Sequence, residues 1–108
     1  MKLAADNLDV ETVTTIYTCP PGQRAIVTVN LCNRGATPAK LRVALTSGAA
    51  PTDADWIEYD TPVQAAGAPG GSVLQLTGIA LGGGQRIYAR SSTGEVSAVV
   101  FGIEEVAG

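Results

Sequence analysis

The chain of 108 residues contains no histidine, and it has few aromatic residues and few charges. Aromatic side chains make up 5% of it and charged side chains 16%. Without histidine, the Ser-His-Asp and Cys-His pairings of nucleophilic catalysis are absent by composition. The sequence therefore predicts no enzyme, no catalytic residue, no metal and no cofactor. A surface poor in charge is easily covered by protein partners.

The chain also lacks a basic surplus and a long apolar run. Its net charge is −3, and acidic and apolar residues separate its seven lysines and arginines. Nucleic-acid binding needs a basic face, and a membrane helix needs about 20 apolar residues. The first ten residues, MKLAADNLDV, have no apolar segment of the signal-peptide kind. We expect a protein made in the cytoplasm that binds neither nucleic acid nor membrane.

Short alternating segments separated by glycine and proline turns fill the chain instead. Seven strand candidates follow one another, at residues 11–18, 24–33, 39–46, 55–59, 72–78, 85–92 and 96–103. Sequential strands at this spacing predict an all-β fold, an antiparallel β-sandwich or jelly-roll-like barrel of seven to eight short strands joined by hairpins. We expect an N-terminal arm over residues 1–9, one β domain over 10–105 and a tail over 106–108.

The alternation also predicts which side chains face the core. In the second segment Ala25, Val27, Val29 and Leu31 share one face, and Ile26, Thr28, Asn30 and Cys32 share the other. In the third, Leu41, Val43 and Leu45 should point inward, with Lys40, Arg42 and Ala44 outward. Residues 96–103 are apolar on both faces, so this strand is either central or covered by another subunit.

Cys19 and Cys32 are the two cysteines. If the turn CPPGQ joins the first two strands as a hairpin, the two thiols lie on the order of 27 Å apart. A disulfide needs Cα atoms within about 7 Å, so an internal bridge is not expected. Two readings stay open: free thiols in a reducing cytosol, or bonds from both cysteines to neighbouring subunits formed in an oxidising medium.

Three further features have both a functional and a structural interpretation. The carboxylates Asp53, Asp55, Glu58 and Asp60 suggest a hydrolase or calcium site, but the segment lacks an EF-hand loop and is better explained by loop fixing. GGGQR at 82–86 is a turn before a strand, not a phosphate loop. Trp56 and Tyr59, like the other aromatic residues, are candidates for the core, a sugar platform or a subunit interface.

Several phrases together resemble one protein family. They lie at Ile16–Gly22, Asn30–Arg34, Asp53–Asp60, Thr77–Gly84, Ile87–Ser91 and Gly102–Glu105. This pattern is similar to that of small virion structural proteins of tailed bacteriophages. It covers roughly residues 12–105 and contains no catalytic signature. One departure is Cys19, where the family pattern usually has valine or a similar apolar residue.

The resemblance implies a capsid decoration (cement) protein, a homotrimer seated on the outer surface of a phage head. Its partner would be the major capsid protein, which it would clamp against its neighbours. The alternatives are a tail, neck or fibre component and a carbohydrate- or receptor-binding module. We expect contacts to partners from the arm, the acidic tail and a few surface residues, namely Lys2, Leu3, Leu8, Arg34, Trp56, Tyr59, Glu104 and Glu105.

Overall fold

The computed structural model describes residues 1–107 as an all-β fold with a single short 3-10 helix, η1 (Asp53–Asp55). The strands are β1 (Lys2–Leu8), β2 (Thr14–Thr18), β3 (Gln23–Asn33), β4 (Ala39–Thr46), β5 (Trp56–Val63), β6 (Val73–Gly82), β7 (Arg86–Ser91) and β8 (Val96–Val106). Among these residues no helix is long and apolar enough to cross a membrane.

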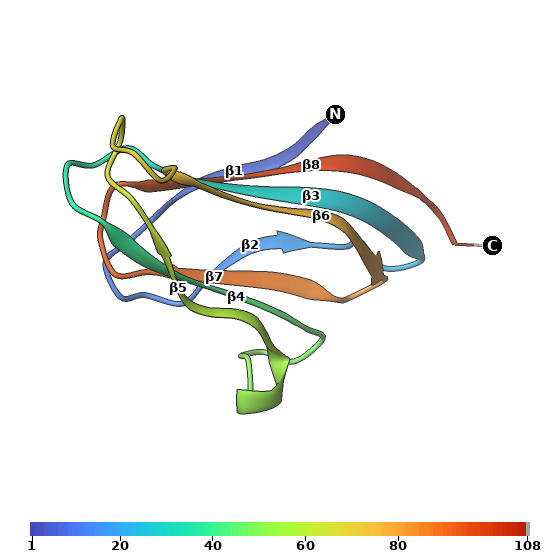
Figure 1. The fold of residues 1–108 in the computed structure, drawn as a ribbon. Helices are drawn as coiled ribbons and strands as arrows, with labels where there is room; N and C mark the ends of the chain where they lie inside the picture. The colour runs from blue at the N-terminus through green and yellow to red at the C-terminus, as the bar shows by residue number, and fades with distance from the viewer. Residues whose placement is uncertain (108) are drawn as a thin grey trace.

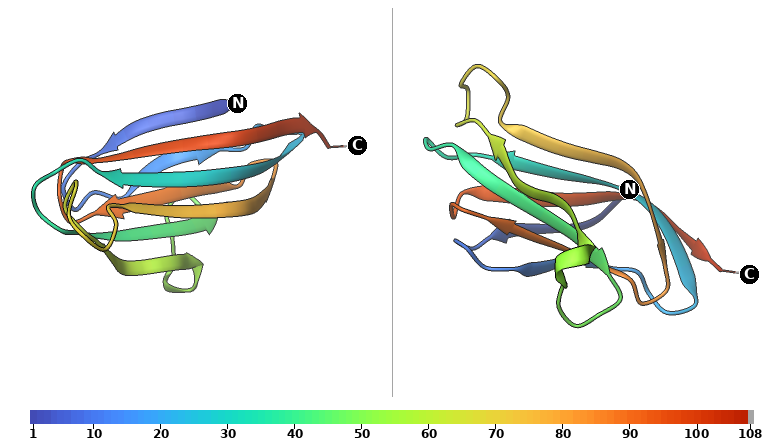
Figure 2. Two further views of the ribbon diagram at one scale, coloured as in Figure 1. Left: turned by 45° about the horizontal axis from the view of Figure 1, so that its top comes forward. Right: turned by 60° about the horizontal axis from the view of Figure 1, so that its bottom comes forward.

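The strands form two antiparallel sheets of four, in the orders β1-β8-β3-β6 and β2-β7-β4-β5 (Figures 1 and 2). Only the β4–β5 connection stays within one sheet, because every other pair of consecutive strands is divided between the two sheets. This order is that of a jelly roll, in which two Greek keys wrap into a sandwich. The expected antiparallel sandwich of seven to eight strands is confirmed.

The core lies between the sheets and follows the predicted alternation. Ala25, Val27, Val29 and Leu31 of β3 are all buried, as are Leu41 and Val43 of β4. Strand β8 lies between β1 and β3, so it is central within its sheet. That position does not cover its outer side, where Ile103 is 66% exposed, and the covering of this strand by another subunit stays a prediction. Its inner side chains, Val96, Ala98 and Val100, are almost fully buried.

The expected hairpin at CPPGQ is wrong. Strand β2 pairs with β7 of one sheet, and β3 pairs with β6 and β8 of the other, so this turn carries the chain across the sandwich. The turns after β3, β6 and β7 cross in the same way. Alternation reveals which face of a strand is buried but not which strand pairs with it, and the hairpin argument about the cysteines therefore fails. Both cysteines are nevertheless free.

Other local expectations also differ from the structure. Residues 2–8, expected to form an arm, pair with β8 as strand β1. At the other end Val106 belongs to β8, and Gly108 of the expected tail lies outside the described residues. Ala44, expected outward, is fully buried, and its cross-strand partners are two large aromatic residues, Tyr88 on one side and Trp56 on the other.

The ladders at the centre and at the edges of the sheets differ. The β3–β8 ladder runs from Gln23–Val106 to Asn33–Val96 without a register shift, and the β4–β7 ladder is also continuous. Each of the four edge strands, β1, β2, β5 and β6, has at least one register shift against its neighbour. Irregular edges discourage strand addition from another chain. A partner is therefore expected to bind a face rather than an edge.

Candidate functional site

The two sheets differ in the side chains on their outer surfaces. The outer face of the β1-β8-β3-β6 sheet carries five apolar residues, with Thr28, Asn30 and Gln75 on the same side among them. We call the five the apolar face: Ile26, Val73, Val99, Phe101 and Ile103. Ile26 is 58% exposed and Ile103 66% exposed, and the two are cross-strand partners. On the other sheet, two arginines, Arg42 of β4 and Arg90 of β7, are cross-strand partners. Exposed apolar side chains that adjoin one another commonly mark a contact surface.

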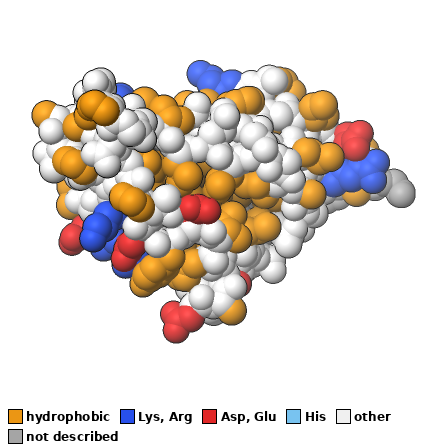
Figure 3. Space-filling model, viewed as in Figure 1, with side chains coloured by type: hydrophobic (Ala, Val, Ile, Leu, Met, Phe, Trp, Pro, Cys, Tyr) orange, Lys and Arg blue, Asp and Glu red, His pale blue; other side chains and the backbone are white. Residues whose placement is uncertain are grey.

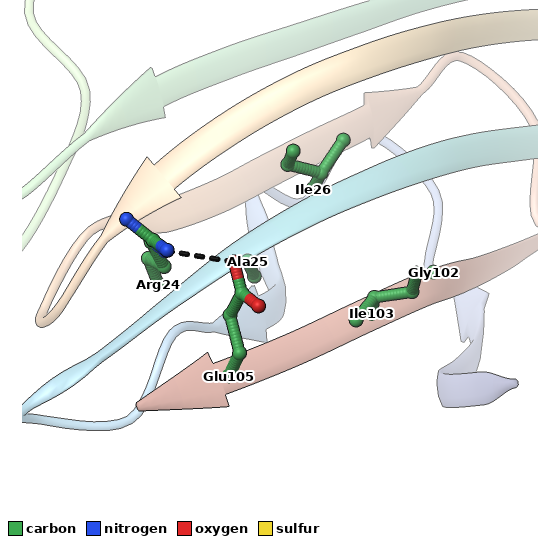
Figure 4. Close-up of a pocket in the computed structure, with 6 residues that line it drawn as sticks. All are labelled: Arg24, Ala25, Ile26, Gly102, Ile103 and Glu105. Atoms are coloured by element: carbon green, nitrogen blue, oxygen red, sulfur yellow. Dashed lines mark hydrogen bonds and ion pairs between the residues drawn. The ribbon is translucent and has the colours of Figure 1, made fainter. Parts of the chain in front are cut away.

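A hollow of about 280 Å³ opens beside the apolar face (Figure 4). It is lined by Ile26 and Ile103 and by the backbone at Gly102. A side chain at Gly102 is excluded, because a Cβ there would lie 2.2 Å from the carbonyl oxygen of Ile26. The missing side chain lets β3 and β8 approach closely where the hollow forms.

One ion pair closes an end of this hollow. Figure 4 shows Arg24 and Glu105 reaching toward each other from neighbouring strands, with Arg24 Nε 2.8 Å from Glu105 Oε1. Both side chains are more than half exposed, so the pair contributes little to stability.

Apolar side chains are also visible between the two sheets. Figure 3 shows hydrophobic atoms gathered in a band across this side of the molecule, with charged groups mainly near its ends. The inward-facing residues Leu74, Leu76 and Ile79 of the edge strand β6 are only partly buried. The sandwich is thus incompletely covered along this edge.

The second candidate site is a cluster of aromatic residues on the other sheet. Trp56 and Tyr59 of β5 meet edge to face, with ring centroids 5.8 Å apart, and with Asp53 they line an open hollow of about 450 Å³. The Arg42 guanidinium lies 4.0 Å from the Tyr59 ring centroid. Trp56 is half-buried and Tyr59 is exposed. These rings therefore belong to the surface rather than to the core.

The acidic segment has structural roles at three of its four positions. Asp55 accepts hydrogen bonds from the backbone and hydroxyl of Thr52, which cap η1 and lower the pKa of this carboxyl. Asp60 accepts two hydrogen bonds from Arg42, at 2.7 and 3.2 Å, which also lower its pKa. Glu58 accepts from the Thr61 hydroxyl. Within residues 1–107 no group of three candidate ligands converges to hold a metal.

Cys19 directly follows β2 and is fully buried. Its sulfur is 3.6 Å from the Gln23 carbonyl oxygen, and burial raises the pKa of the thiol. The adjacent Tyr17 hydroxyl donates to Glu104 of the opposite sheet, and desolvation raises the pKa of Tyr17 far above its ordinary value. A bond from Cys19 to a neighbouring subunit is not supported, because its sulfur is inaccessible in this fold. Cys32 is half-buried and belongs to the outward side of β3, opposite Val73.

The predicted contact residues are scattered. Leu8 is fully buried and Leu3 packs against the core, so neither forms part of a free arm. Lys2 is exposed, and Arg34 donates a hydrogen bond to Asn7 Oδ1. Glu104 is held by Tyr17 and Glu105 by Arg24, while only Trp56 and Tyr59 come together in one place.

The sequence indicates the β8 part of the apolar face, because residues 96–103 are apolar on both sides, but it does not single out Ile26 as its partner. Ile26 lies on the side of its strand away from Ala25 and Val27, where an isoleucine has no core to fill. The same parity applies to Ile103 on β8. Two large apolar residues at outward-facing positions of adjacent central strands identify such a face.

No protein-family model and no curated protein matches the chain. Among solved structures, it is similar to two crystal structures of a pentameric capsid protein isolated from metagenomic phage sequences, one of them solved by iodide SAD phasing. Identity is 21% and 22% over 97% of this chain, with TM-scores of 0.45 and 0.46, and the chain spans 65% of the length of each. At this identity and TM-score the likeness carries no argument about function.

Proposed function

We propose that this protein is a structural component of a phage particle, a decoration protein that sits on the outer surface of the capsid and clamps neighbouring copies of the major capsid protein. The observation that carries the proposal is the apolar face, which lies on the outer side of a jelly roll whose sheet edges are all irregular. The sequence phrases shared with small phage virion proteins support the same reading.

The size of the face suits a protein contact. The whole outer side of this sheet, of which the apolar face is a part, has four strands about 4.8 Å apart with about nine residues of about 3.4 Å each, and presents about 600 Å². A standard specific interface uses roughly 800 Å² per partner, so the face and its flanks suffice. The opposite sheet is less suitable, because Lys40, Arg42 and Arg90 on its outer side would have to be desolvated.

The action of such a protein is mechanical. A ligand that binds only the assembled shell stabilises that shell by mass action, by about 2.7 kcal/mol at one hundred times its dissociation constant. Many copies distributed over a capsid would together oppose the pressure of packaged DNA. This action requires rigid faces rather than chemical groups.

We also propose that the working form is a homo-oligomer, a trimer, and that Cys32 is the cysteine able to bond to a neighbouring subunit. Cys32 lies on the outward side of β3 beside the apolar face. Light scattering gives the mass of the free protein, and a mass other than three chains excludes the trimer. Non-reducing electrophoresis of particles tests the bond, and monomer alone in both reduced and unreduced lanes excludes it.

The docking experiment mixes the purified protein with capsids of the encoding phage that lack it. The double variant I26T/I103T keeps β-branched side chains at both positions while removing apolar surface. We expect its binding to capsids, measured by co-sedimentation, to weaken by about tenfold or more, a loss of about 1.4 kcal/mol. The matched control is Ile57→Thr, a similarly exposed isoleucine on the opposite sheet. Equal binding by I26T/I103T and the wild type would exclude the apolar face.

The alternative position, on a tail, neck or fibre, differs in copy number. Gel densitometry of purified particles against the major capsid protein distinguishes the two. Decoration predicts hundreds of copies per particle, whereas a few or a few tens would assign the protein to the tail.

A further inference from the structure

The aromatic hollow is the feature that capsid docking leaves unexplained. It consists of Trp56, Tyr59 and Asp53, and its volume of about 450 Å³ falls within the usual range of ligand sites. It lies on the β2-β7-β4-β5 sheet, opposite the apolar face. A molecule docked through the apolar face would therefore leave this hollow open to solvent.

The side chain of Tyr59 is held in place by its neighbours although most of it is exposed. The ring is 58% exposed, yet Arg42 lies over it at 4.0 Å and Trp56 abuts it at 5.8 Å. Arg42 is itself fixed by two hydrogen bonds to Asp60, a non-glycine residue with a φ of 53°. An aromatic side chain ordered before binding loses little conformational entropy when a ligand arrives.

The approach to the hollow is ordered as well. Asp53 begins η1, whose Thr52–Asp55 capping box fixes the turn that leads into Trp56. Further along β5, Glu58 accepts a hydrogen bond from Thr61 at 2.6 Å. The Asp53 carboxylate is exposed, and no hydrogen bond or ion pair engages it among residues 1–107.

We propose that this hollow binds a neutral saccharide, whose C–H groups contact the Trp56 and Tyr59 rings, inclined at 73° to each other, while its hydroxyls donate to the Asp53 carboxylate. The electron-rich face of an aromatic ring attracts weakly positive C–H groups. A cationic ligand fits less well, because Arg42 already occupies the cation position over Tyr59. An anionic ligand would meet Asp53. The site is independent of the proposed virion function, since it rests on different residues on the other sheet.

The competing occupant is a protein, because tryptophan, tyrosine and arginine are also enriched at the centres of protein interfaces. The saccharide is favoured by the carboxylate that lacks a partner, since charged residues are depleted from interface cores. The experiment below distinguishes the two occupants.

Trp56 is the only tryptophan of the chain, so its fluorescence reports on the site directly. The probes are maltotetraose, cellotetraose, chitotetraose and mannotetraose, each titrated into the full chain. We expect at least one to change the emission saturably. For a probe that binds, Tyr59→Ala and Asp53→Asn should each raise the dissociation constant obtained from the titration by about tenfold. The control Ile103→Thr, on the opposite sheet, should bind as the wild type does.

Two results would overturn the proposal. One is the absence of a saturable change with all four probes. The other is binding that both Tyr59→Ala and Asp53→Asn leave unchanged. Asp53→Asn alters an exposed side chain and keeps the test valid if Tyr59→Ala fails to fold. If Tyr59→Ala instead weakens capsid binding while no probe binds, the rings belong to a protein interface.

Discussion

Replacing Gly102 with alanine should be among the most damaging single changes to this fold. Gly102 lies in the central strand β8 opposite Val27, and its amide donates at 2.8 Å to the carbonyl of Met1, the residue before β1. It therefore contacts both neighbours of β8. A Cβ at this position would lie 2.2 Å from the Ile26 carbonyl oxygen and 2.8 Å from the Val27 Cα.

The cost follows from the kind of atom that the methyl group meets. Both are backbone atoms of β3, so relief requires moving a strand whose ladder to β8 is otherwise unbroken. Overpacking typically costs about 1–3 kcal/mol, and an unfavourable backbone conformation adds about 1–3 kcal/mol. The φ of Gly102 is 157°, a value that alanine rarely adopts. We expect a loss of about 3–5 kcal/mol, out of the roughly 5–15 kcal/mol typical of a domain.

Urea unfolding followed by circular dichroism measures this loss, and for a domain of this size the melting temperature should fall by about 15 °C or more. Two controls separate the causes. Gly78→Ala has a φ of 70° but no atom within 4 Å of the added Cβ, so it reports conformational strain alone. Gly82→Ala meets only Gln85 Oε1 at 3.8 Å and should be nearly neutral. A loss below about 1 kcal/mol for Gly102→Ala would refute the packing of β3 against β8 described above.

Three smaller predictions concern titration and reactivity. The pKa of Tyr17 is raised in the folded state, so the free energy of unfolding should fall above about pH 10, by at most about 1.4 kcal/mol per pH unit. Urea titrations between pH 9 and 11 measure this slope, and Tyr17→Phe should remove it. Because Arg42 lowers the folded pKa of Asp60, its contribution is present above about pH 4 and is lost as the pH falls further. Asp60→Asn should therefore flatten the acid decline of the melting temperature, and an unchanged profile would contradict the ion pair. A thiol reagent should modify Cys32 in the folded protein and Cys19 only in denaturant, whereas equal rates would contradict the burial of Cys19.

Strand positions and buried faces were predictable from the sequence, but strand partners were not. The alternation from Ala25 to Leu31 identified the inner side of β3 because a sheet buries one side of each strand. It carried no information on whether the turn after Thr18 returns within a sheet or crosses to the other one. The sequence predicts an arm over residues 1–9 because KLAADN lacks alternation, yet main-chain pairing with β8 fixes residues 2–8 without that signal.

The surface sites were predictable only in part. Proximity of Trp56 and Tyr59 in sequence suggested an aromatic cluster, and the structure brings these two rings together. The role of Arg42 depends on the β4–β5 pairing, which sets it beside Tyr59 and Asp60. Likewise, the hollow at Gly102 arises from the close approach of β3 to β8, which no local pattern encodes.

An image reconstruction of the intact phage particle tests the central claim most directly. The virion proposal predicts density for this jelly roll in many copies on the outside of the head. In that density the β1-β8-β3-β6 sheet should face the capsid, with Ile26 and Ile103 covered and the aromatic hollow turned to solvent. Particles without this protein, or density in which the apolar face is exposed and the opposite sheet is docked, would contradict the proposal.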